Sequence, residues 1–139
     1  MKKPILIIYT IAVILSFYNL SMAETTTVDK EFQGIWIQNS QNSCASAIRI
    51  EVRKDSVVLH NNKDTAKFGN LDVCYSCAGG AQYSGIEVHL FPEKEIAPSP
   101  FIIRFNADER KGILVIEMQD VKLKNRFPFD KYIFKKCKL

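Results

Sequence analysis

Apolar side chains recur at every second position through much of the chain after Gly34. The pattern is clearest in residues 47–53, where Ile48, Ile50 and Val52 share one face and charged residues share the other. Alternation of period two is typical of antiparallel strands with one face in a core and the other in solvent. The same pattern places Val88 and Leu90 inward with Ile86, and Ile103 inward with Phe101 and Phe105. Strands are predicted at Gly34–Gln38, 47–53, 56–60, 86–90, Phe101–Phe105, Ile113–Met118, 121–125 and 131–136.

Turn-forming residues separate these runs. Lys54-Asp55 and residues 106–112 indicate hairpin turns. Residues 61–64 and 92–100 are predicted loops, because Asn and Asp favour turns and Pro lacks the amide donor of a strand. About eight short strands without a convincing helix predict an all-β fold, a small closed or nearly closed antiparallel barrel. A sandwich is the alternative.

The first 23 residues carry a different pattern. Lys2 and Lys3 precede an apolar run over residues 5–17, and Ser21-Met22-Ala23 follows. This is typical of a secretory signal peptide cut before Glu24, since the run is shorter than the about twenty residues of a membrane span. An uncleaved anchor is the alternative. We therefore predict a signal peptide over 1–23 and one exported β domain over 24–139, periplasmic or secreted, with no membrane span after signal removal.

The net charge of the chain excludes few classes of binding partner. The chain has 19 basic and 15 acidic residues, and without the two signal-peptide lysines 17 basic residues remain. The basic residues crowd the last eighteen positions, where we expect them to form the solvated face of the last strands. Contact with nucleic acid, anionic lipid or an acidic partner is the alternative. Since no phosphate-binding loop or aromatic-basic motif occurs, we expect no nucleic-acid partner and no cofactor. The crowded residues are Lys122, Lys124, Arg126, Lys131, Lys135, Lys136 and Lys138.

All four cysteines, Cys44, Cys74, Cys77 and Cys137, follow the signal segment. An even number in an exported chain predicts two disulfides, for which three pairings exist. We favour the two pairings that tie the Cys74–Cys77 segment to both other cysteines over direct Cys74–Cys77 and Cys44–Cys137 bridges. A redox site is not expected, because Cys-x-x-Cys here lacks the strand–helix context of disulfide exchangers. A zinc site is not expected either, because two of the four cysteines stand alone.

The sequence contains no strong catalytic motif. His60 and His89 have no neighbouring nucleophile motif, and Ser84-Gly85 lacks the glycine pattern of a nucleophile elbow. Glu93 and Glu95 lie in a Pro-bounded loop with no shielding from water. We predict that the protein is not an enzyme.

Gly34-Ile35-Trp36 is similar to the first-strand signature of lipocalin-like barrels. The resemblance implies that Trp36 packs across one end of the barrel and that an arginine, Arg104 or Arg126, stacks on it. It also implies an internal cavity for a small apolar ligand. The alternative is a barrel filled by its own Phe and Ile side chains.

The segment from Cys74 to Phe91 has the composition of a recognition surface. A disulfide-held loop with tyrosines presents contact area at a small entropic cost. We expect it to contact another protein, such as a hydrolase, in the manner of inhibitors or immunity proteins. Alternatives are turn glycines and packed tyrosines without binding, a lipocalin-like carrier, or a structural envelope component. The expected contact residues are Tyr75, Gly79, Gly80, Tyr83, Ser84 and Gly85.

Bacterial lysozyme inhibitors carry a Ser-Gly loop motif that ends in Tyr. Ser84-Gly85 is similar to its first two positions, whereas Ile86 and Glu87 depart from it. The weak positive charge argues against a basic lysozyme as the target.

Overall fold

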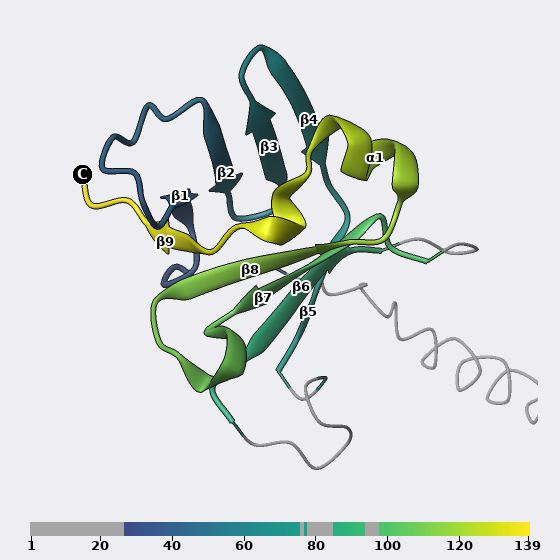
Figure 1. Ribbon diagram of the computed structural model, residues 1–139. Coiled ribbons are helices and arrows are strands. Elements are labelled where there is room, and N and C mark those ends of the chain that lie inside the picture. Colours follow the sequence, from purple (N-terminus) through teal and green to yellow (C-terminus); the bar gives the residue numbers. More distant parts are fainter. Residues whose placement is uncertain (1–26, 76, 78–84, 94–97) are drawn as a thin grey trace, which may run out of the picture.

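The strands of this protein form one continuous antiparallel sheet (Figure 1). The computed structural model describes residues 27–75, 77, 85–93 and 98–139. Within these ranges nine strands are joined by hairpin turns, two short 3-10 turns and one short helix. The strands are β1 (Gly34–Gln38), β2 (Ile48–Val52), β3 (Val57–Asn61), β4 (Asp64–Phe68), β5 (Leu71–Cys74), β6 (Val88–Pro92), β7 (Phe101–Phe105), β8 (Ile113–Met118) and β9 (Phe134–Lys136). The other elements are η2 (Ala107–Glu109), α1 (Val121–Arg126) and η3 (Phe129–Lys131).

The sheet curls into a nearly closed barrel, as the sequence predicts. Its strand order is β4-β3-β2-β1-β9-β8-β7-β6-β5, and every neighbouring pair is antiparallel. Strands β1 to β4 and β5 to β8 each form a meander of sequential neighbours. The last strand, β9, lies between β1 and β8 and joins the two meanders into one sheet.

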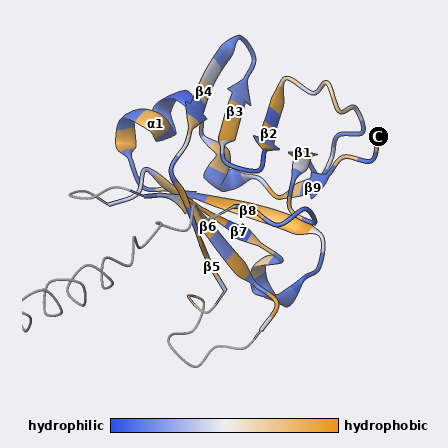
Figure 2. Cartoon of the chain, turned by 180° about the vertical axis from the view of Figure 1, so that it is seen from behind, coloured by the Kyte–Doolittle hydropathy of each residue, from blue (hydrophilic) through white to orange (hydrophobic). Residues whose placement is uncertain are grey.

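The inward positions predicted from the alternation form the core. Phe101, Ile103 and Phe105 of β7 are fully buried, and Leu90 of β6 faces them. Figure 2 shows hydrophobic and hydrophilic residues following one another along the strands. Ile86 differs from the prediction, since it precedes β6 and is only partly buried.

Trp36 packs inside the barrel beside Phe105, with 5.5 Å between ring centroids. Its indole nitrogen donates a hydrogen bond to the Phe32 carbonyl at 3.0 Å. The ring of Phe32 stacks on Phe105 at 4.3 Å. The segment before β1 thus covers part of the core.

The predicted strand over 121–125 is wrong, because this segment forms α1. The carboxylate of Asp120 accepts a hydrogen bond from the Leu123 amide at 2.8 Å and caps the helix. Leu123 and Phe127 are buried, whereas Val121 is 72% exposed. The buried residues Leu123 and Phe127 are four positions apart, which is the spacing of one helix face. The sequence predicts a strand because Val121 and Leu123 are two positions apart, as apolar residues are on one face of a strand.

Two strands, β4 and β5, are missing from the prediction, and β9 is shorter than predicted. β4 is largely polar, and its Ala66 and Phe68 are only partly buried. The loop predicted at 61–64 is a tight hairpin, in which Asn61 pairs with Asp64 and Asn62 has a left-handed φ of 56°. Asn accepts this conformation more readily than most residues, so the turn itself fits its sequence.

The disulfides are Cys44–Cys137 and Cys74–Cys77, so the favoured cross-tied pairings are wrong. A disulfide needs Cα atoms within about 7 Å, and both observed pairs are at 5.6 Å. Cys137 follows β9, which pairs with β1, and Cys44 lies between β1 and β2. Cys74 ends β5 at the far edge of the sheet, with three strands between β5 and β9.

Across the described ranges, no helix has both the length and the apolar character needed to cross a membrane.

Candidate functional site at the β5–β6 connection

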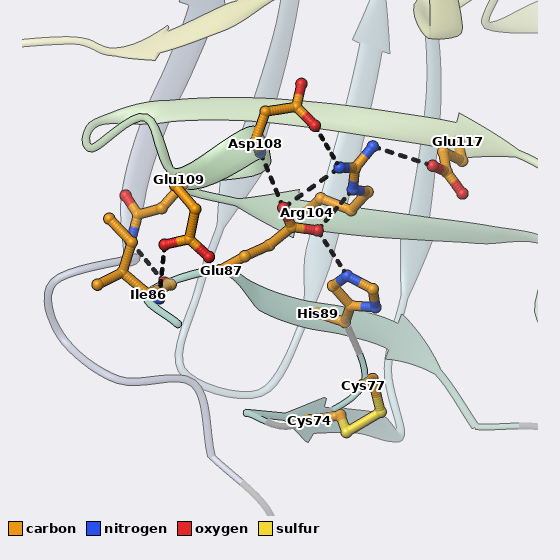
Figure 3. A network of polar contacts seen from close by, with 10 residues as sticks. Cys74, Cys77, Ile86, Glu87, His89, Arg104, Asp108, Glu109 and Glu117 are labelled. Atoms are coloured by element: carbon orange, nitrogen blue, oxygen red, sulfur yellow. Dashed lines mark hydrogen bonds and ion pairs between the residues drawn. A yellow bond between two sulfur atoms is a disulfide. The ribbon is translucent and has the colours of Figure 1, made fainter. Parts of the chain in front are cut away.

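The predicted contact residues belong to the connection between β5 and β6. Cys74, Tyr75, Cys77 and Gly85 are within the described structure. Gly79, Gly80, Tyr83 and Ser84 are outside the described residues. Cys74 is the register partner of His89 on the neighbouring strand, so the Cys74–Cys77 disulfide lies beside the outer face of β6 (Figure 3).

Tyr75 is held at the first end of the connection. The residue is 52% exposed, and its hydroxyl donates a hydrogen bond to the carboxylate of Asp29. The acceptor carboxylate disfavours the phenolate and, with partial desolvation, raises the pKa of Tyr75 to about 12. The ring is therefore neutral, half exposed and tied to the segment before β1.

Ile86 is held at the second end. Its amide donates to Oε2 of Glu109 at 3.1 Å, and its carbonyl accepts from the Asn106 side chain at 3.1 Å. Glu109 belongs to η2 and Asn106 precedes it, so both contacts come from the connection between β7 and β8. The backbone at this end of the segment is attached to the barrel through two hydrogen bonds.

Glu87 forms the centre of a polar network just beyond this point (Figure 3). Its side chain is only 6% exposed, yet both oxygens have partners. Nε of Arg104 donates to Oε1 at 2.7 Å and Nη2 to Oε2 at 3.2 Å. His89 Nε2 lies 2.8 Å from Oε1, and the amide of Asp108 donates to Oε2 at 2.8 Å. The guanidinium holds the pKa of Glu87 at about 2, against an opposing effect of burial.

Arg104 extends the network across three strands. It also donates to Glu117 of β8 at 3.2 Å and to Asp108 of η2 at 3.0 Å. The hydrogen bond to Glu87 raises the pKa of Arg104 most, and the bond to Asp108 and the negative charge of Glu117 raise it further. The buried charge of Glu87 is thereby paired and hydrogen-bonded, which is the condition for its burial.

The backbone conformation of η2 directs its polar groups towards this network. Asn106, Asp108 and Glu109 have left-handed φ values of 53°, 54° and 60°. Non-glycine residues adopt this region at a cost, so surrounding contacts have to hold them there. The Asn106 side chain accepts a hydrogen bond from the Gly112 amide at 2.9 Å, and the Asp108 amide points at Glu87.

This arrangement is suited to holding a surface in place. The low pKa of Glu87 and its complete set of partners make it a poor proton acceptor. In the ranges that the structure covers, no group of three or more His, Cys, Asp or Glu side chains is placed to hold a metal ion. The network attaches the backbone at residues 86 and 87 to the β7–β8 connection and to β7.

The remaining candidates lie elsewhere. His60 faces Glu51 on β2 at 3.4 Å. The stacking of an arginine on Trp36 is absent from the described residues, since Arg104 belongs to the outer network and Arg126 lies over the Phe127 ring at 5.0 Å.

The sequence contained a signal for the network that single-strand patterns do not reveal. His89, Arg104 and Glu117 occupy polar positions of three neighbouring strands, which the pairing brings together, and Glu87 lies directly before β6. Asp108 had no such signal, because only the left-handed backbone of η2 directs it there.

Comparisons of the chain with models of protein families, with curated proteins and with solved structures found no match.

Proposed function

We propose that this chain is an exported binding protein, periplasmic or secreted, that contacts another protein through its β5–β6 connection. The observation that carries the proposal is the attachment of both ends of this connection while Tyr75 remains 52% exposed. A partner that binds a segment with fixed ends loses less conformational entropy than one that must order it. An exposed tyrosine on such a support is a typical contact residue.

The disulfides support the exported location. Disulfides form and persist in oxidising compartments such as the periplasm and the extracellular space. Both pairs of cysteines are bonded, and Cys74–Cys77 closes the start of the proposed contact segment. The location also rests on residues 1–23, which lie outside the described structure.

A hydrolase, bound in the manner of an inhibitor or immunity protein, is the partner class that we favour. The support is indirect and comes from a small disulfide-bonded β domain in which Glu87, at the centre of the outer polar network, has partners for both carboxylate oxygens. The carrier alternative has less support, because aromatic side chains occupy the described interior. Phe101, Phe105, Phe127, Phe129 and Phe134 are all fully buried.

Capture of a partner tests the proposal. Residues 24–139, produced under oxidising conditions and immobilised, should retain a stoichiometric protein from envelope extract or from a panel of hydrolases, identified by mass spectrometry. The Tyr75→Ala/Tyr83→Ala variant should lose that partner. Val121→Ala, which shortens an exposed apolar side chain on α1, should retain it.

Tyr75→Phe separates contact from support, since it keeps the ring and removes the bond to Asp29. Retained capture by this variant would indicate that the ring itself is the contact. Equal capture by wild type and Tyr75→Ala/Tyr83→Ala would contradict the assignment of the contact surface. A co-purified lipid without a protein would favour the carrier.

A further inference from the structure

A hollow of about 340 Å³ lies beside the last strand, away from the β5–β6 connection. We call it the β9 pocket. It is open to solvent on one side, and its size is within the range of small-molecule sites. Its lining residues are Ile37, Asn42, Lys135, Lys136, Cys137 and Lys138.

The pocket exists because a long connection folds back over the outside of the barrel. Ile37 points outward from β1, where a strand residue is normally exposed, yet it is only 1% exposed. The connection between β1 and β2 covers it, and the Cys44–Cys137 disulfide fastens this connection to the end of the chain. Figure 1 shows the C-terminus beside the β1–β2 connection. The amide of Cys137 also donates to the Ile35 carbonyl at 2.7 Å.

Lys135 and Lys138 line this pocket on the face of the sheet that carries Ile37, whereas the side chain of Lys136 lies on the opposite face, beside Gly34. Nζ of Lys135 donates to the Asn42 side chain at 3.3 Å, and Nζ of Lys136 donates to the Glu31 carbonyl at 2.9 Å. Among the described residues, neither these two lysines nor Lys138 forms an ion pair, the terminal carboxylate included.

Two other basic residues in this part of the chain do have carboxylate partners. Lys124 pairs with Asp130 at 2.6 Å, and Arg126 pairs with Asp64 at 2.7 Å. The basic residues crowded near the end of the sequence thus include two with carboxylate partners, whereas Lys135 and Lys138 beside the pocket have none within the described residues, as is also true of Lys122 and Lys131. Like charges in one pocket repel each other, and an anion between them would remove that repulsion.

We propose that the β9 pocket binds a small organic anion through a carboxylate or phosphate group. Lys135 and Lys138 provide the charge, Asn42 provides an amide donor, and the disulfide-held connection forms the wall. This inference concerns a different face from the protein-binding surface and stands independently of it.

Titration with simple anions tests the proposal. Amide resonances of 15N-labelled residues 24–139 should shift saturably with butyl phosphate or butyrate at constant ionic strength, at residues 35–42 and 135–138. The two probes distinguish a phosphate from a carboxylate head group. Lys135→Met/Lys138→Met keeps the aliphatic chains, removes two charges and should weaken binding about tenfold or more.

Lys63→Met/Lys67→Met is the matched control, since it makes the same charge change in β4 and the turn before it, at the far edge of the sheet. It should alter the affinity less than about twofold. Shifts that do not saturate with either probe, or equal weakening by both double variants, would overturn the proposal. Dispersed spectra of each variant show that the fold is retained.

Discussion

At the scale of single residues, Glu87 is the clearest case of a group whose charge depends on its surroundings. A carboxylate with a 6% exposed side chain is costly to bury, and Arg104, His89 and the Asp108 amide offset that cost. If the charge of Glu87 is removed, Arg104 keeps only Asp108 and Glu117 as carboxylate partners, and both side chains are more exposed than that of Glu87. Glu87 is therefore expected to make folding pH-dependent.

The sign of that dependence follows from the pKa. The folded-state pKa of Glu87 is about 2, below its ordinary value of 4.5. Its charge therefore stabilises the protein above pH 4.5, and the contribution is lost as the pH falls towards 2. A shift of this size corresponds to about 3 kcal/mol. Urea unfolding between pH 5 and 2 should show wild type losing this stability, and Glu87→Gln should show a much flatter profile.

Glu117→Gln provides the comparison, because it removes an exposed contact of the same guanidinium. It should keep the wild-type slope. Identical slopes for wild type and Glu87→Gln would contradict the assignment of the low pKa to Glu87.

Gly34 is a second residue whose identity is dictated locally. Its φ is 137°, and a Cβ there would lie 2.9 Å from Cε of Lys136. Gly34→Ala should lower the free energy of unfolding by about 1–3 kcal/mol, because side chains strain this backbone. Gly69→Ala, with nothing within 4 Å of an added Cβ, should change it by about 0.5 kcal/mol or less. Thermal and urea unfolding measure both; equal effects would refute the role of φ.

At the scale of elements, alternation was sufficient where one face of a strand is strongly apolar. β1, β7 and β8 match their predicted bounds. Large apolar residues such as Phe101 and Ile103 can be buried only on one face of the strand, so the pattern admits one assignment of inward and outward positions. α1 could not be recognised in this way, because only tertiary contact shows that Leu123 is buried and Val121 exposed. β4 was missed because its polar residues lie at an edge, where one side of the ladder has no neighbour.

The two disulfides should differ greatly in their contribution to stability. Cys44–Cys137 spans 93 positions, whereas Cys74–Cys77 spans three. In the chain-entropy model the long loop contributes about 4–5 kcal/mol and the short one roughly 2 kcal/mol. Denaturant unfolding of Cys44→Ser/Cys137→Ser should therefore show the larger loss, and Cys74→Ser/Cys77→Ser the smaller. The reverse order would mean that native-state packing outweighs loop length.

At the scale of the whole molecule, β9 is the one described strand that connects the two meanders. Without it, β1 and β8 have no partner on their inner sides, and Phe134 is missing from the core. Removal of residues 134–139 should therefore abolish cooperative folding, measured by near-UV circular dichroism and amide dispersion. Removal of residues 138–139 alone, both exposed, should leave the fold intact. A folded product of the longer truncation would show that the meanders fold separately.

Part of the candidate surface could be predicted from the sequence, but the contacts that attach it to the barrel could not. Composition identified the Cys and Tyr residues of the connection, because such residues are unusual in a loop. The attachments of Tyr75 to Asp29 and Ile86 to Glu109 join residues 46 and 23 positions apart. Contacts over such separations follow from the topology of the sheet, which no local pattern encodes.

Because β9 follows both meanders in the sequence, its position also sets the order of events during synthesis. As the ribosome releases the chain, both meanders are complete before the strand that joins them, so the barrel cannot close until β9 emerges. A polypeptide threaded through a translocation channel has to remain unfolded while it crosses. If residues 1–23 direct export, as the sequence predicts, the late closing strand keeps the chain competent for passage until β9 has been made.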